Sequence, residues 1–246
     1  PAVAMAGKLT VVEVEEIVDT KPEEVEPELD TQVEEEVTGP LTVSAIQSGP
    51  DSKECAVPFG SMLVNVSLTL EKVVVTAPPY VHQVVGEMLE GFYVQDPGGG
   101  PWAGILVTFS TGGLPSFKPG ATVTLYGNYK EDKCTSIFAA QNLLVENMQG
   151  EEPAPYDSTP SDLLADPEAF EGVLVKITNA VVQDKNPDSS EGYDFGQFMV
   201  DGGLRVGNDY KLAYMSPGTD GRLVGDTFNH IIGVLKLDHG NWVLMP

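Results

Sequence analysis

Residues 91–99 read Gly-Phe-Tyr-Val-Gln-Asp-Pro-Gly-Gly, and residues 196–203 read Gly-Gln-Phe-Met-Val-Asp-Gly-Gly. Each run joins β-favouring side chains to an acidic residue and a glycine turn, which is typical of a strand and the turn after it. The two runs begin about 105 residues apart, and two further pairs of segments recur in the same order near that spacing: 64–76 with 172–182, and 120–129 with 225–234. This internal repeat predicts two copies of one small β-barrel.

The composition also favours an all-β chain. The chain contains 26 glycines and 19 prolines, which indicates frequent turns. Its length of 246 residues is sufficient for two ordinary domains, each with its own core. We expect an acidic N-terminal strand and linker at 1–40, a first barrel at 41–148, a linker at 149–160 and a second barrel at 161–246. A short capped helix is expected at 161–165.

The net charge of −24 limits the classes of partner. A free polyanion such as DNA is repelled by such a surface, whereas basic partners and divalent cations are attracted. Residues 41–147 contain five lysines and no arginine, so the aromatic residues there are expected mainly in the core rather than on a nucleic-acid-binding face. An acidic surface is compatible with glycan binding. Sugars stack on aromatic rings such as Trp102 or Trp242 and do not need basic side chains beside them.

The N-terminal 40 residues differ from the rest of the chain. Residues 9–18 are apolar and β-branched, and 12 acidic side chains lie between Glu13 and Glu36. We interpret the first part as a strand and the remainder as a self-repelling linker, the alternative being a disordered acidic tail. Such a strand can be ordered by pairing with a sheet edge. The predicted assembly strand consists of Leu9, Val11, Val12, Val14, Ile17 and Val18.

Segments 60–75, 91–99, 104–105 and 120–131 each carry strand and turn signatures. Together they resemble the OB-fold-like domains of secreted bacterial surface lipoproteins, similar to those that precede extracellular endonuclease/exonuclease/phosphatase enzymes. The resemblance extends over residues 41–246 and implies two tandem OB-like small β-barrels at a cell surface. The nuclease domain of that family is absent from this sequence, so the resemblance supplies no catalytic residue.

The two cysteines, Cys55 and Cys134, permit one disulfide in an oxidising compartment or two reduced thiols. In the barrel interpretation, the regions around them can approach, which favours the disulfide. No apolar stretch reaches the roughly 18 to 20 residues that span a bilayer. The two cysteines and the acidic, lysine-poor surface together predict an extracellular or cell-surface location.

One loop carries a weak calcium pattern. Asp184, Asn186, Asp188 and Ser190 alternate as oxygen donors, which resembles the first half of a calcium-binding loop. Ser189 stands where the turn glycine of such a loop belongs, and Phe195 stands where a bidentate glutamate belongs. The alternatives are therefore calcium as a cofactor and a solvated acidic loop.

The sequence predicts no enzyme. Its three histidines, His82, His230 and His239, have neither zinc-site nor nucleophile-and-base spacing, and there is no phosphate-binding glycine motif. We expect a non-catalytic structural or interaction protein that associates with itself or with another surface protein, as a subunit of a fibre or layer assembled by strand addition. The alternative is an accessory module that binds glycan or single-stranded nucleic acid for a secreted hydrolase system.

Overall fold

The structure is a computed structural model that describes residues 41–47, 67–84, 87–109, 118–132, 134–207 and 222–246. All of them belong to one compact unit, Gly39–Pro246. The unit is mostly β-structure, which confirms the predicted all-β class. Within these ranges no helix has the length and apolar character needed to cross a membrane.

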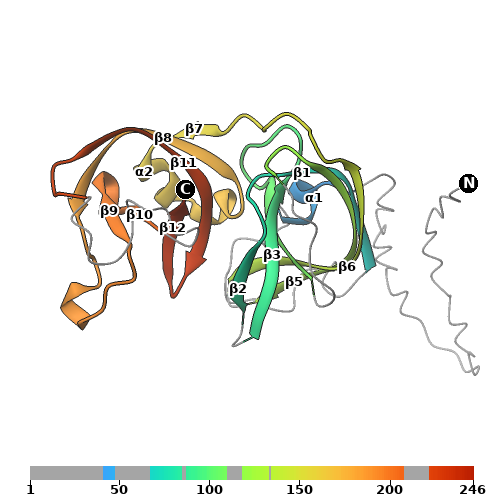
Figure 1. Cartoon of the computed structure of the whole chain (residues 1–246), viewed down its shortest axis with the longest axis horizontal. Helices are drawn as coiled ribbons and strands as arrows, with labels where there is room; N and C mark the ends of the chain where they lie inside the picture. Colours follow the sequence, from blue (N-terminus) through green and yellow to red (C-terminus); the bar gives the residue numbers. More distant parts are fainter. Residues whose placement is uncertain (1–40, 48–66, 85–86, 110–117, 133, 208–221) are drawn as a thin grey trace, which may run out of the picture. The chain divides into compact units, whose positions relative to one another are not determined.

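The first sheet closes into a ring of five strands. In chain order they are β1 (Ser67–Val75), β3 (Glu87–Gln95), β4 (Gly104–Phe109), β5 (Thr122–Asp132) and β6 (Thr135–Asn147). The order around the ring is β1, β3, β4, β6 and β5, and β5 pairs again with β1. Neighbours are antiparallel except β4 and β6, which are parallel. The strand β2 (Tyr80–Val84) extends the sheet by pairing with β3 (Figure 1).

Register shifts bend the long strands of this ring, and two of them lie at positions with unusual backbone geometry. The pairing of β1 with β5 shifts between Leu70 and Val73, and Lys72 adopts a left-handed φ of 54° there. The second shift lies at Gly127 on β5, where a Cβ atom would lie 2.2 Å from the carbonyl oxygen of Ala139. Bulges of this kind increase the local twist and bend that a small closed barrel needs.

The inward side chains of the first ring form one hydrophobic core. Burial alternates along β1, as expected for a strand with one face inside. The core includes Leu70, Val73, Val75, Phe92, Val94, Ile105, Val107, Val123, Leu125 and Phe138.

A short helix, α1 (Val43–Gln47), packs against this core through Val43 and Ile46. Its start is capped by Asp96, which follows β3. The carboxylate of Asp96 accepts hydrogen bonds from the backbone N–H groups of Val43 (2.8 Å) and Ser44 (2.9 Å) and from the Ser44 hydroxyl. The acidic residue of the repeated strand-and-turn motif therefore anchors this helix to the barrel.

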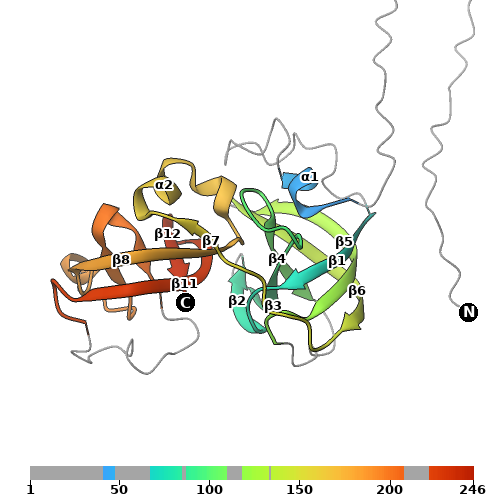
Figure 2. The ribbon, with the colours of Figure 1, turned by 90° about the horizontal axis from the view of Figure 1, so that it is seen from above.

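The second sheet closes in the same way. Its ring contains β8 (Leu174–Asp184), β9 (Phe198–Val200), β10 (Arg205–Val206), β11 (Thr227–Asp238) and β12 (Asn241–Met245). The order is β8, β9, β10, β12 and β11, and only β10 and β12 are parallel among these neighbours. The ring closes where β11 pairs with β8 (Figure 2). Strand order and direction therefore match those of the first ring. Its core includes Val175, Ile177, Val182, Phe198, Val200, Leu204, Leu235 and Leu244.

Short elements precede and interrupt the second ring. The helix expected at 161–165 is present as α2 (Pro160–Ala165), capped by Thr159, whose hydroxyl accepts from the Asp162 N–H. The expected linker at 149–160 ends in a strand, β7 (Tyr156–Ser158), that pairs in parallel with β8. Three single-turn 3₁₀ helices follow: η1 (Pro167–Phe170), η2 (Ser189–Glu191) and η3 (Asp201–Gly203).

Backbone and side-chain hydrogen bonds join the two rings. The Leu174 N–H donates to Gln95 Oε1 (3.2 Å), and the Trp102 N–H donates to the Ala169 carbonyl. Outward-facing side chains add an apolar contact between the rings, made by Ala77, Tyr93, Leu106, Ile137, Leu174 and Val234. The two barrels thus share a junction that has its own small core.

At the centre of this junction two glycines bring the backbones into contact. A Cβ atom on Gly104 would lie 2.1 Å from the carbonyl carbon of Gly172. No side chain fits in that space without moving one backbone away from the other.

The first prediction concerns this contact. Gly104→Ala should lower the free energy of unfolding by about 1–3 kcal/mol, because the added methyl group forces the backbones apart. Thermal denaturation by circular dichroism measures the effect. Gly98→Ala is the control, since nothing lies within 4 Å of a Cβ atom there. Equal melting temperatures for the two variants would show that the glycine contact is not required.

Candidate ligand-binding site

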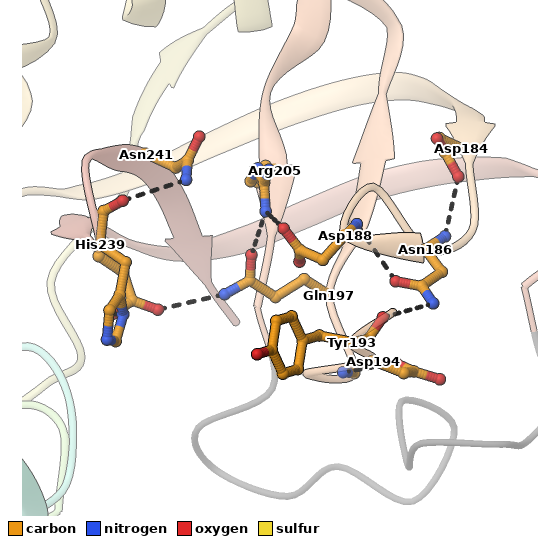
Figure 3. Close-up of polar contacts among 11 residues, drawn as sticks. Asp184, Asn186, Asp188, Tyr193, Asp194, Gln197, Arg205, His239 and Asn241 are labelled. Atoms are coloured by element: carbon orange, nitrogen blue, oxygen red, sulfur yellow. Dashed lines mark hydrogen bonds and ion pairs between the residues drawn. The ribbon is translucent and has the colours of Figure 1, made fainter. Parts of the chain in front are cut away.

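The loop between β8 and β9 (185–197) is organised by the side chain of Asn186. Its Oδ1 accepts from the Asp188 N–H (3.3 Å), its Nδ2 donates to the Tyr193 carbonyl (3.0 Å), and its own N–H donates to Asp184 Oδ1 (2.9 Å). These bonds bring the two ends of the loop together around η2. Asn186 therefore fixes the backbone at Tyr193 (Figure 3).

Two aromatic rings on this loop are exposed to solvent. Tyr193 is 57% exposed and Phe195 is 61% exposed, and the two rings stack with centroids 5.5 Å apart and planes 20° apart. Single apolar residues at a surface are ordinary, but a stacked aromatic pair presents a larger flat apolar area. Such a pair is suited to stacking against a sugar ring or a base.

A chain of polar contacts runs from the same loop to the turn between β11 and β12. Arg205 on β10 donates to Asp188 Oδ1 (2.7 Å) and to Gln197 Oε1 (3.3 Å). The Nε2 of Gln197 donates to Asp238 Oδ2 (3.2 Å), and Asp238 Oδ1 contacts His239 Nδ1 (2.8 Å). These contacts tie the loop, β10 and the turn into one surface (Figure 3).

The charge of this surface is acidic. Residues 184–197 include four acidic side chains and one lysine. The guanidinium of Arg205 is paired with Asp188, so its charge is compensated within the protein. A polyanion therefore meets little free positive charge here, whereas hydroxyl groups find amide and carboxylate partners.

The predicted calcium ligands share this loop but already have protein partners. Asp184 and Asn186 accept backbone hydrogen bonds, Asp188 faces Arg205, and Ser190 is exposed. Among the described residues, no group of three or more His, Cys, Asp or Glu side chains is arranged to hold a metal ion. Calcium therefore remains a prediction of the sequence alone.

The two predicted stacking residues occupy packing positions. Trp102 and Trp242 are both half-buried against the core of the second ring. Trp102 comes from the turn before β4, so it reaches across the junction with a φ of 67°. Neither ring offers an open face comparable to that of Tyr193.

The remaining predicted residues lie in or beside parts outside the described ranges. The assembly strand at Leu9–Val18 belongs entirely to residues 1–40. Cys134 is disulfide-bonded. Cys55, the only other cysteine of the sequence, is not among the described residues.

Sequence analysis missed the aromatic pair and the polar chain. Phe195 was noted only because it occupies the position of a calcium-binding glutamate. The available signal was the pattern Tyr193-Asp194-Phe195 in a loop that is otherwise polar or rich in turn residues, where aromatic residues have no core to fill. The hydrogen bonds that link Arg205, Gln197 and Asp238 could not be predicted from their places in the sequence. These side chains meet only because the ring of strands closes.

Comparison of the chain with models of known protein families and with curated proteins gives no match. The function therefore has to be argued from the geometry of this surface.

The second prediction concerns the loop. Asn186→Ala removes the two hydrogen bonds made by the Asn186 side chain, to the Asp188 N–H and to the Tyr193 carbonyl, so the Tyr193 backbone should become mobile while the barrel stays folded. Protection of the loop amides from hydrogen exchange should fall about five- to tenfold, corresponding to about 1 kcal/mol. Ser190→Ala in the same loop is the control. If the two variants exchange alike, Asn186 does not organise the loop.

Proposed function

We propose that the chain is a non-catalytic extracellular protein of two tandem OB-like barrels, and that the second barrel binds a neutral or cationic glycan on Tyr193 and Phe195. The observation that carries this proposal is the exposed, stacked aromatic pair beside a polar network that includes Arg205 and Asp188.

The strand order supports the OB-like interpretation. OB barrels are five-stranded Greek-key barrels that bind oligosaccharides and oligonucleotides on strands 2 and 3 and on the loops 1–2 and 4–5. In the second ring, strands 2 and 3 are β9 and β10, loop 1–2 is 185–197, and loop 4–5 is the turn at His239. The aromatic pair and the polar chain lie on these elements.

The chemistry of the surface favours a glycan over a nucleic acid. Stacking on Tyr193 and Phe195 would serve either ligand, but a nucleic acid also requires uncompensated cations along its backbone. The paired Arg205 and the surrounding carboxylates do not supply them. The disulfide at Cys134 and the acidic surface support an extracellular location for such a binding module.

The third prediction tests the aromatic pair. Tyr193→Ala and Phe195→Ala should each weaken binding by about five- to tenfold, or about 1–1.4 kcal/mol, because each removes a stacking face. Binding is measured by affinity electrophoresis and calorimetry with neutral β-glucan, xylan, glucomannan and cationic chitosan oligosaccharides. Tyr126→Ala is the control, since Tyr126 is 42% exposed on the first ring.

Two outcomes would contradict this function. Failure of every tested glycan to bind would remove the glycan proposal. Binding of single-stranded oligo-dT that depends on Tyr193 would assign the same surface to nucleic acid instead.

Assembly by strand addition is the second candidate function, and the edge of the first sheet favours it. In the described part of the chain, β2 pairs with β3 alone, so its other backbone edge is open to a further strand. The apolar residues from Leu9 to Val18 are the segment we propose to occupy such an edge, in the same chain or in a second copy. The acidic linker would keep unassembled chains soluble.

The fourth prediction tests this assembly. Removal of residues 1–38 should abolish large species in light scattering and leave the melting temperature unchanged, because the compact unit starts at Gly39. Val14→Pro in the full chain is the matched variant, since it disrupts strand pairing but preserves every charge. Strand addition would be contradicted if either variant assembled to the same extent as the unmodified full chain. It would also be contradicted if the unmodified full chain stayed monomeric.

A further inference from the structure

A buried carboxyl group lies at the junction between the two barrels. Glu171 follows η1 in the second barrel and is only 3% exposed. Its Oε2 accepts a hydrogen bond of 2.9 Å from the backbone N–H of Ser136, which belongs to β6 of the first barrel. Its Oε1 is buried and has no hydrogen-bond partner among the described residues. An ionised carboxylate is costly in this position, because only one of its oxygens is hydrogen-bonded.

The groups around Glu171 do not compensate a negative charge. Glu131 on β5 accepts hydrogen bonds from the hydroxyl groups of Ser136 (2.9 Å) and Tyr129 (3.0 Å). Glu131 and Glu168 are the described charged groups that act on Glu171, and both are acidic. On β11, Glu171 forms a bridge with Leu235.

We propose that the contact between the barrels is controlled by a proton on Glu171: the contact is tight while this carboxyl group is protonated and loosens when it ionises. A neutral carboxyl group accepts the Ser136 N–H through Oε2 and leaves no buried charge. After ionisation, Glu171 regains hydration only if the junction opens, and repulsion from Glu131 and Glu168 acts in the same direction.

The ionisation equilibria give the direction of the pH effect. Burial raises the pKa of Glu171 well above 4.5, and the charges of Glu131 and Glu168 add to this, whereas the Ser136 hydrogen bond opposes it. Burial also raises the pKa of Glu168 to about 7, with contributions from Glu131 and Asp166. When the junction is open, Glu171 and Glu168 lose their protons at a lower pH than when the junction is closed. The free energy of opening is therefore highest at or below about pH 4.5 and falls as the pH rises towards the pKa of the closed state.

The experiment measures opening in the full chain by hydrogen exchange. The junction amides are those of Ser136, Leu174 and Trp102, and strand amides such as Val107 report on the first barrel itself. Protection factors corrected for intrinsic exchange should fall about tenfold or more at the junction between pH 5 and pH 8, since one pKa unit corresponds to a tenfold change. Protection of the strand amides should not change over this range.

Two variants make the test specific. Glu171→Gln should reduce the fall in junction protection between pH 5 and pH 8 to the part that comes from Glu168, while Glu152→Gln, at an exposed site in the linker, should behave as the parent chain. Should Glu171→Gln not fold, Glu168→Gln replaces it: loss of a neighbouring negative charge should move the fall in protection to lower pH. Constant junction protection in the parent chain, an unchanged fall in Glu171→Gln, or an equal fall at the strand amides would each overturn the proposal.

Discussion

Closure of each five-stranded ring is the constraint on which the other features depend. In the first ring, closure requires β1 to pair with β5 along most of its length and with β3 through only Val74 and Val75. A strand that changes partner in this way must bend, and the bulge after Leu70 supplies the bend. Once the ring is closed, its connecting loops are confined to the two ends of the barrel, which decides which side chains can meet there.

The junction shows how two closed rings pack together without a flexible hinge. The core of each ring is enclosed by its own strands. The contact between the two rings is therefore made by outward-facing side chains such as Tyr93 and Ile137, and by the close approach of the Gly104 backbone to the Gly172 backbone. Apolar burial and backbone hydrogen bonds hold this contact, and the buried Glu171 opposes it whenever it is charged. A contact balanced in this way is sensitive to protonation.

The sequence predicted the repeated elements but not the contacts between them. All three recurring segments correspond to equivalent strands: β1 with β8, β3 with β9, and β5 with β11. Their alternation and glycine turns are local properties, so one sequence reveals them. The partners of individual side chains are not local.

The motif that begins at Gly91 illustrates this limit. Its residues predicted a strand and a turn, yet Asp96 caps a helix 53 residues earlier in the chain, and Gln95 accepts a hydrogen bond from Leu174 in the other barrel. Trp102 was predicted as a stacking residue because sugars can stack on an aromatic ring without positive charge, but it packs across the junction. Only the closed fold determines which loop aromatics are covered.

The same reasoning explains why the proposed ligand surface lies on the second barrel. In the first ring, Tyr93 on β3 and Leu106 on β4 point outward from strands 2 and 3 and pack against the second barrel. The segment between strands 1 and 2 contains β2, and the turn between strands 4 and 5 carries the disulfide-bonded Cys134. The second barrel reaches the junction through strands 1 and 4 instead, with Leu174 on β8 and Val234 on β11. Among the described residues, those of its strands 2 and 3 and of the loop 185–197 are not part of this apolar contact, and the exposed aromatic pair lies on that loop. The outward faces of strands 2 and 3 thus pack at the junction in the first barrel, and in the second barrel they adjoin the surface on which we propose that glycans bind.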